Sequence, residues 1–243
     1  MISVIIPVFN ERDNINKLAK ELNEVSKTIP ITEIIFIDDA STDGSIEVLV
    51  EIKKIMFNTR VLHHKKRLGQ SAALFTGINS AKYKIIVTLD GDGQNPPNDI
   101  KILWNSYINY KKDNTYEDFL ILGQRLKRMD SFIKKFTSKI ANNIRSFFLS
   151  DKIKDTGCSL KLFPKDLFLR LPYFNHMHRF LPALMLRASA NIIPVEVSHR
   201  KREFGMSKYG TINRAIVGIV DLFGVFWLMK RSIKVKEKYF EEI

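Results

Sequence analysis

Short apolar runs alternate with segments of helical spacing over the first ninety residues, and this alternation restricts the fold more than any other feature. The apolar runs cover residues 2–8, 33–37, 60–63 and 84–89. Between them apolar residues recur at the spacing of an amphipathic helix, as at Ile15, Leu18, Leu22 and Val25, and a small-residue helix is expected from Gln70 to Ser80. Strands alternating with helices predict an α/β fold with a parallel, doubly wound sheet.

Polar clusters stand where three of these predicted strands end. They are Asn10 with Glu11, Asp38 with Asp39, and Asp90 with Asp92. The carboxyl ends of parallel strands share one edge of the sheet, and ligands of such sheets bind there. We therefore predict one ligand site at this edge, with Asp38 as the member that could instead only cap the following turn.

The stretch from Lys84 to Pro97 predicts a metal site. If the extended geometry persists beyond the strand, Asp90, Asp92 and Gln94 point to the same side. Three oxygen donors without His or Cys suit a hard cation, Mg²⁺ or Mn²⁺, that also takes oxygens from a substrate phosphate. The alternative is an acidic turn that caps a helix starting at the following proline pair.

Charge and composition narrow the class of partner. The net charge of +13 indicates an anionic partner: nucleic acid, a phosphorylated substrate or an acidic membrane surface. The chain has neither a Gly-rich phosphate loop ending in Gly-Lys-Ser/Thr nor a Gly-x-Gly-x-x-Gly fingerprint, which disfavours kinases, P-loop hydrolases and ordinary dehydrogenases. A single cysteine, Cys158, excludes an internal disulfide framework. Without a basic and then apolar N-terminal segment, we expect the protein to stay in a reducing cytoplasm.

Three segments, residues 3–11, 37–45 and 89–97, resemble the signature segments of family 2 glycosyltransferases. The Asp-x-Asp followed by Gln and two prolines is similar to the dolichol-phosphate mannose synthase and polyprenyl-phosphate glycosyltransferase branch, as are residues 155–159 and 199–209. The resemblance implies a Rossmann-like fold of nucleotide-sugar transferase type A, in a single domain. It also implies inverting, metal-dependent transfer of a sugar from a GDP- or UDP-hexose to a dolichyl or undecaprenyl phosphate.

The same resemblance implies roles for individual side chains. The nucleotide sugar would be bound by Pro7, Phe9, Asn10, Glu11, Asp39, Gln70, Asp90 and Arg125. The metal would be held by Asp90, Asp92 and Gln94, and the acceptor phosphate by His178, Arg179, Arg202, Ser207 and Lys208. Catalytic roles would fall to Asp92, Asp155 and Arg202. For Gln70 and Asp155 the alternative is helix or turn capping, and for His178 and Arg179 a structural role.

An acceptor phosphate also determines which catalytic groups are needed. A phosphate monoester, with a second pKa of about 6, is mostly dianionic at neutral pH. It therefore needs no strong general base, in agreement with the lack of a candidate His in the strand-end loops.

The second half carries the excess positive charge and the predicted membrane contact. Residues 125–154 predict an amphipathic helix with one basic face, and residues 215–229 form an apolar stretch with basic flanks. This stretch is too short to span a bilayer and predicts a helix on an anionic membrane surface, with a final core helix as the alternative. We divide the chain into a nucleotide and metal half (1–124), an acceptor half (125–210) and a C-terminal helix with a charged tail (211–243). The expected location is peripheral, on the cytoplasmic face of the membrane.

Two other functions compete with this prediction. A family 2 enzyme acting on a saccharide hydroxyl would need a general base, and Asp155 would then matter more. A nucleic-acid-binding protein would explain the charge, but it leaves the strand-end carboxylates without a role, so no nucleic-acid partner is expected. No motif specifies the nucleotide, the sugar, the carrier length or the oligomeric state.

Overall fold

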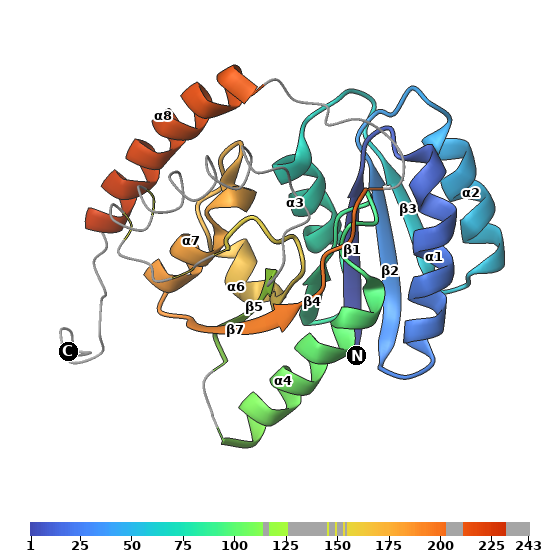
Figure 1. The fold of residues 1–243 in the computed structure, drawn as a ribbon, viewed down its shortest axis with the longest axis horizontal. Helices are drawn as coiled ribbons and strands as arrows, with labels where there is room; N and C mark the ends of the chain where they lie inside the picture. The colour runs from blue at the N-terminus through green and yellow to red at the C-terminus, as the bar shows by residue number, and fades with distance from the viewer. Residues whose placement is uncertain are drawn as a thin grey trace, which may run out of the picture.

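A seven-stranded sheet runs through the centre of the computed structural model, which describes residues 1–113, 117–125, 145, 149, 153, 155–202 and 211–231 (Figure 1). The strand order is β3-β2-β1-β4-β6-β5-β7. Neighbouring strands are parallel except where β6 pairs with β4 and β5. The strands are β1 (Ile2–Val8), β2 (Ile31–Asp38), β3 (Thr59–His63), β4 (Ile85–Thr88), β5 (Phe119–Arg125), β6 (Lys161–Pro164) and β7 (Asn191–Val197). The prediction of a mostly parallel α/β sheet is confirmed.

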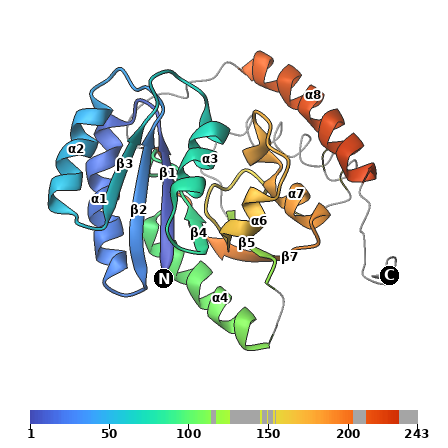
Figure 2. The same ribbon diagram turned by 180° about the vertical axis from the view of Figure 1, so that it is seen from behind.

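Helices cover both faces of this sheet (Figures 1 and 2). One face packs against α1 (Arg12–Ser26), α2 (Ser45–Ile55) and, after the short turn η1 (Pro97–Asp99), α4 (Ile100–Asp113). The other face packs against α3 (Gln70–Ser80), α6 (Lys165–Leu169) and, after the turn η2 (Met177–Arg179), α7 (Leu181–Arg187). The long α8 (Thr211–Lys230) joins this second core through Leu222 and Val225.

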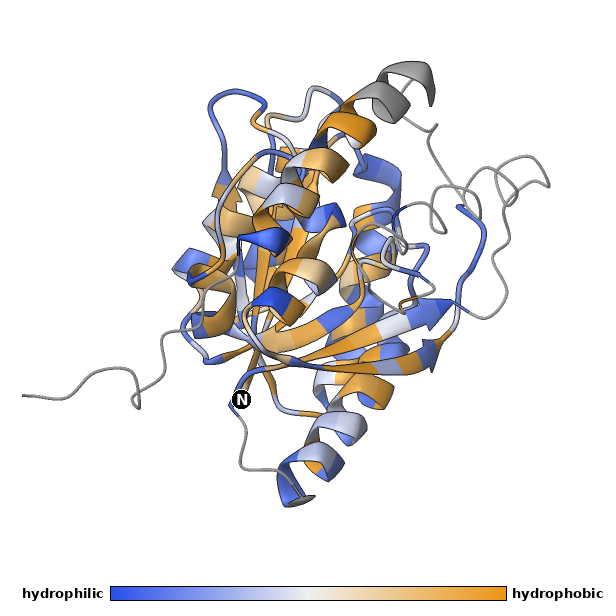
Figure 3. Cartoon of the chain, turned by 90° about the vertical axis from the view of Figure 1, so that its left-hand side faces the viewer, coloured by the Kyte–Doolittle hydropathy of each residue, from blue (hydrophilic) through white to orange (hydrophobic). Residues whose placement is uncertain are grey.

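The apolar side chains of β1 are divided between the two cores. Val4 and Ile6 belong to the core beneath α1, whereas Ile5 belongs to the core beneath α3, and all three are fully buried. A strand buried on both faces reads as a continuous apolar run, which is why residues 2–8 were recognisable in the sequence. Figure 3 shows the same pattern, with the strands of the sheet mostly in the hydrophobic colour.

One local expectation is wrong: the extended geometry does not continue from Asp90 to Gln94. β4 ends at Thr88, and the chain turns at Gly91 and Asp92. A Cβ atom at residue 91 would lie 3.1 Å from the carbonyl oxygen of Pro7, so this close approach to β1 favours glycine. The turn, and not strand alternation, therefore sets the directions of the two carboxylates.

Two predicted helical segments have different outcomes. The apolar stretch at residues 215–229 lies within α8, as expected. No described helix is long and apolar enough to cross a membrane. The predicted amphipathic helix at residues 125–154 lies outside the described residues, apart from Arg125, Arg145, Leu149 and Ile153.

At the amino-terminal edge of the sheet, opposite the polar clusters, a buried carboxylate ties several strands together. Glu33 of β2 accepts hydrogen bonds from the Ser3 hydroxyl (2.6 Å) and the Lys82 main-chain N–H (2.8 Å) and pairs with Arg60 (2.6 Å). Burial alone would raise the pKa of Glu33, but these hydrogen bonds and the arginine charge outweigh it and lower the pKa.

We expect Glu33→Ala to lower the free energy of unfolding by about 3 kcal/mol, because it leaves buried partners without their acceptor. Urea denaturation measures this loss. A carboxyl with a lowered folded-state pKa stabilises the protein above its ordinary value of 4.5, and this stabilisation is lost as the pH falls through the lowered pKa. The difference between the two proteins should therefore shrink in acid. Glu24→Ala, which removes an exposed pair with Lys27, is the control and should cost less than about 1 kcal/mol.

Candidate active site

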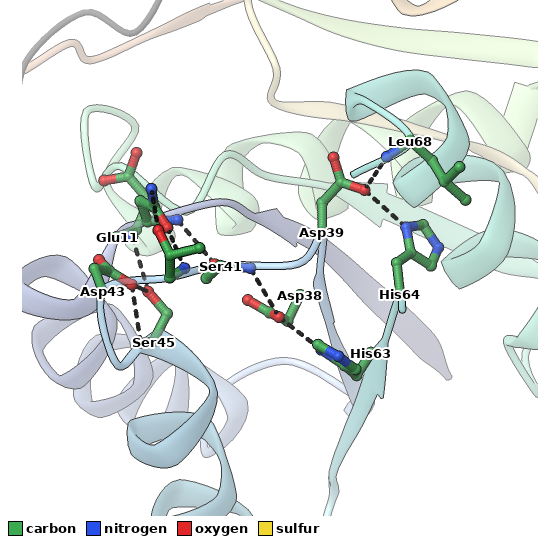
Figure 4. Close-up of polar contacts among 11 residues, drawn as sticks. Glu11, Asp38, Asp39, Ser41, Asp43, Ser45, His63, His64 and Leu68 are labelled. Carbon is green, nitrogen blue, oxygen red and sulfur yellow. Dashed lines mark hydrogen bonds and ion pairs between the residues drawn. The ribbon is translucent and has the colours of Figure 1, made fainter. Parts of the chain in front are cut away.

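The loops after β1 and β2 are interlocked at the carboxyl edge of the sheet (Figure 4). The Asn10 main-chain N–H donates to the Ser41 hydroxyl (2.9 Å), and the Thr42 N–H donates to the Asn10 side-chain oxygen (2.7 Å). Asn10 and Ala40 both adopt left-handed backbone conformations, with φ of 52° and 59°. For alanine this conformation is uncommon and marks a loop held by its surroundings.

Asp38 and Asp39 have different environments although they are adjacent. Asp38 accepts from the Ser41 N–H (3.2 Å) and contacts the His63 ring (2.8 Å), which matches the turn-capping alternative. Asp39 accepts from the Leu68 and Gly69 N–H groups, both at 2.8 Å, and contacts His64 Nδ1 at 2.8 Å (Figure 4). Asp39 thus fixes the loop that leads into α3, and its role toward a nucleotide stays a prediction.

Sequence reasoning missed two histidines at the same edge: His63, the last residue of β3, and His64, which follows it. His64 is buried between Asp39 and the Thr76 hydroxyl, which is 3.0 Å from its Nε2. The expectation that the strand-end loops hold no candidate His is therefore wrong. The signal that identifies them is the same one that marked the other three strands: polar residues where a predicted strand ends.

Asp90 and Asp92 form a carboxylate pair after β4. The Asp90 main-chain N–H donates to the Ser159 hydroxyl (3.2 Å), and the Gln70 side-chain amide donates to Asp90 Oδ1 (2.8 Å). Burial, and then the charge of Asp92, raise the pKa of Asp90 to about 6, although Lys161, Ser159 and Arg125 oppose this rise. A cation bound nearby would stabilise the ionised form of Asp90, which burial and Asp92 disfavour.

The carboxylate pair fits a hard divalent cation that shares its coordination with a substrate. Among the described residues no group of three or more His, Cys, Asp or Glu could hold a metal ion. Mg²⁺ in phosphate-transferring sites is commonly bound through one or two carboxylates plus water and substrate phosphates. Gln94, the third predicted ligand, lies in the same turn, where its N–H donates to Asp92 Oδ1 (3.1 Å).

Arg202, from the segment after β7, reaches this pair from the predicted acceptor half. Its Nη2 lies 2.8 Å from Glu11 Oε1 and 3.3 Å from Asp92 Oδ2. The other oxygen of Glu11 accepts from the Asn14 side chain (2.7 Å). One guanidinium therefore joins the β1 loop to the β4 loop, although these loops are about 80 residues apart in the sequence.

Two residues predicted to act separately form one buried ion pair. Arg125 donates through Nε to Asp155 Oδ2 (2.6 Å) and through Nη2 to Asp155 Oδ1 (2.8 Å). The side chains are only 11% and 9% exposed. Such a fork orients both groups and engages both carboxylate oxygens of Asp155.

The remaining predicted residues lie around this centre. Pro7 is a half-buried residue of β1, and Phe9 lies beneath Arg67, whose guanidinium carbon is 4.0 Å from the ring centroid. His178 contacts the Ser71 hydroxyl (2.8 Å) at the start of α3, and Arg179 follows it in η2. Ser207 and Lys208 lie outside the described residues.

Sequence reasoning also left out three residues that support the carboxylate turn: Ser159, Lys161 and Arg200. Lys161 is buried and donates to the Cys158 carbonyl, and burial lowers the pKa of its ammonium group despite the nearby Asp90 charge. Burial likewise raises the pKa of the Cys158 thiol, in line with a structural cysteine. Ser159 and Arg200 stand inside the motif segments but were given no role. The pairing of β6 with β4 brings Ser159 and Lys161 to the site, whereas Arg200 arrives with the segment after β7.

Comparison with known proteins identifies the family. The model of glycosyl transferase family 2 matches residues 3–171. Dodecaprenyl-phosphate galacturonate synthase of Rhizobium johnstonii is 32% identical over 94% of this chain and 67% of its own length. Undecaprenyl-phosphate 4-deoxy-4-formamido-L-arabinose transferase of Proteus mirabilis is 30% identical over 86% of this chain and 62% of its own length. The chain thus spans about two thirds of the length of these relatives.

A solved structure confirms the type of fold. Glucosyl-3-phosphoglycerate synthase from Mycobacterium tuberculosis, in complex with Mn²⁺, UDP and glucosyl-3-phosphoglycerate, superposes with a TM-score of 0.65 at 16% identity. The match covers 98% of this chain and 81% of that one. The family model and the polyprenyl-phosphate relatives confirm the resemblance seen in the motifs: the chain belongs to glycosyl transferase family 2.

Proposed function

We propose that this glycosyltransferase moves a sugar, with inversion, from a GDP- or UDP-linked donor to a polyprenyl phosphate in a reaction that requires Mg²⁺ or Mn²⁺. The observation that carries the proposal is the contact of Arg202 with Glu11 and Asp92. A cationic side chain from the predicted acceptor half meets the predicted donor loops at a carboxylate pair. The relatives named as dodecaprenyl- and undecaprenyl-phosphate sugar transferases support the same acceptor class.

The donor would lie along the loops after β1, β2 and β4. Pro7, Phe9, Asn10 and Glu11 would surround the base and ribose, with Asp39 and Gln70 fixing the neighbouring loop and helix start. Asp90, Asp92 and Gln94 would hold the cation, which supplies positive charge where the leaving diphosphate becomes more negative.

The acceptor phosphate would approach from the side of Arg202, Ser207 and Lys208, with His178 and Arg179 beside it. Its oxygen forms a bond to the anomeric carbon of the sugar, while the bond from that carbon to the donor diphosphate breaks. The diphosphate leaves with the bonding electron pair on the opposite face, so the configuration inverts.

The state of Asp155 favours a phosphate acceptor over a hydroxyl acceptor. A hydroxyl acceptor must lose a proton to a base. Asp155 is poorly suited to be that base, because Arg125 engages both of its carboxylate oxygens. A phosphate acceptor is already ionised and needs no base. The role of Asp155 is then to orient Arg125 toward a phosphate group. We therefore assign these two residues to one phosphate-facing unit.

α8 provides a surface on which the enzyme would rest against the membrane that holds its lipid acceptor. Its outer side exposes the large apolar residues Val217, Ile219, Val220, Phe223 and Trp227. Its inner side contributes Leu222 and Val225 to the core, and Asp221 pairs with His176 (3.2 Å). An apolar helix face of this kind, with Lys230 and Arg231 at its end, suits the boundary between headgroups and acyl chains.

Asp90→Asn should stabilise the protein in buffer free of divalent cations, by about 1–3 kcal/mol at pH 8. Because the folded-state pKa of about 6 lies above the ordinary 3.8, the wild-type carboxyl stabilises fully below pH 3.8 and loses this stabilisation as the pH rises through about 6. Urea denaturation at pH 4.5 and pH 8 should therefore show a gain mainly at pH 8. Mn²⁺ should then stabilise the wild type more than the variant. Asp13→Asn, on exposed α1 surface, is the control, and an equal gain at both pH values would contradict the prediction.

Radiolabelled sugar should pass from one of a panel of GDP- and UDP-sugars into organic-extractable polyprenyl phosphate. EDTA should abolish this transfer. Asp92→Ala should reduce it by at least about a hundredfold, because the cation that Asp92 would hold stabilises the charge on the leaving diphosphate, and stabilisation of this kind contributes that much. If one donor is hydrolysed but no lipid is labelled, the proposed acceptor is wrong and the proposed donor site still stands. Full activity in the presence of EDTA would exclude a requirement for a divalent cation.

Replacing both Phe223 and Trp227 by Glu should weaken binding to anionic vesicles at least about tenfold, because each large apolar side chain contributes more than 1 kcal/mol on burial. Flotation with phosphatidylglycerol-containing vesicles measures this binding. The matched control is the pair Ile55→Glu and Phe57→Glu, which changes two exposed apolar residues at the end of α2. An equal effect of both pairs would contradict the assignment of α8.

A further inference from the structure

The segment at residues 198–202 lies along the loop that carries the carboxylate pair. The Ser198 N–H donates to Asp99 Oδ2 (2.6 Å), and the Arg200 N–H donates to the carbonyl of Gln94 (3.0 Å). Two residues later, Arg202 contacts Asp92. Every second residue of the segment therefore contacts the 92–99 loop, although about a hundred residues separate the two stretches.

The Arg200 side chain joins this loop to α1. Its Nε donates to the carbonyl of Gly93, and its Nη1 and Nη2 donate to the two carboxylate oxygens of Glu21 at 2.9 and 2.8 Å. Both side chains are less than a third exposed. A guanidinium held in such a two-bond fork has a fixed orientation, and Glu21 balances its charge.

The turn that Arg200 holds is the one that directs Asp92. Gly93 adopts a left-handed conformation with φ of 69°, and the Gln94 N–H donates to the Asp92 carboxylate. Arg200 thus binds the carbonyl groups of the two residues that follow Asp92, through its side chain and its main chain. Carboxylates that bind a metal depend on such supporting contacts for their orientation.

We infer that Arg200 is a positioning residue that, together with Glu21, holds the turn at residues 91–94 and so sets the affinity of Asp92 for the divalent cation. The inference rests on the proposed function and assigns Arg200 a task different from that of Arg202. Arg202 faces the site, whereas the Arg200 guanidinium faces Glu21 and the back of the turn.

Mn²⁺ affinity tests this inference directly. Electron paramagnetic resonance of free Mn²⁺, in the presence of saturating GDP or UDP, gives the dissociation constant without turnover. We expect Arg200→Ala to weaken Mn²⁺ binding by about 10- to 100-fold, the usual effect of losing a contact that orients a metal ligand. Glu21→Gln and Arg200→Lys should weaken it less, and kcat should recover at saturating Mn²⁺.

Arg170→Ala is the control, because Arg170 also pairs with a carboxylate, donating through Nη2 to both oxygens of Asp118 at 2.7 Å, outside the candidate site. If Arg200→Ala binds Mn²⁺ as Arg170→Ala does, the inference is overturned and the proposed function is unaffected. Wild-type protein that binds no Mn²⁺ with either nucleotide would instead overturn the metal assignment itself. Should Arg200→Ala fail to fold, the same comparison made with Glu21→Gln decides the question.

Discussion

Burial of β1 on both faces is the constraint on which the rest of the structure depends. Ile5 on one face and Val4 and Ile6 on the other fix this strand between two helix layers, with β2 and β4 hydrogen-bonded on either side. Parallel pairing then brings the ends of three strands to one edge. The polar loops follow directly, so the apolar core determines where the carboxylates meet.

This edge concentrates negative charge that the protein only partly neutralises. The charge of Asp92 acts on Asp90, and Arg202 contacts both Asp92 and Glu11. Arg202 and the buried Lys161 offset part of this negative charge. Burial, and then the charge of Asp92, nevertheless keep the pKa of Asp90 raised. A site of this kind is less stable than an apolar edge would be, which is the usual relation between stability and function in active sites.

Elements with strong local patterns were predictable from the sequence, including β1 and the helix from Gln70 to Ser80. Asp90 and Asp92 could be predicted from their position at the end of a strand. The expected strand alternation between them was wrong, because the chain turns there. Long-range pairs were beyond reach: Arg125 and Asp155 were assigned separately, and Arg200 meets Glu21 across 179 positions. Such contacts depend on how β5, β6 and β7 are ordered in the sheet, which no local pattern encodes.

The reversed direction of β6 determines which connections reach the functional edge of the sheet. In a parallel strand the residues that follow the strand reach the functional edge, whereas in β6 the residues that precede it do so, among them Asp155 and Ser159. The end of β5 and the start of β6 therefore both lie at this edge, and the chain between them connects two points on the same side of the sheet. A change in the length of that connection leaves the loops after β1, β2 and β4 at their own lengths, so the two parts of this edge can diverge independently in evolution.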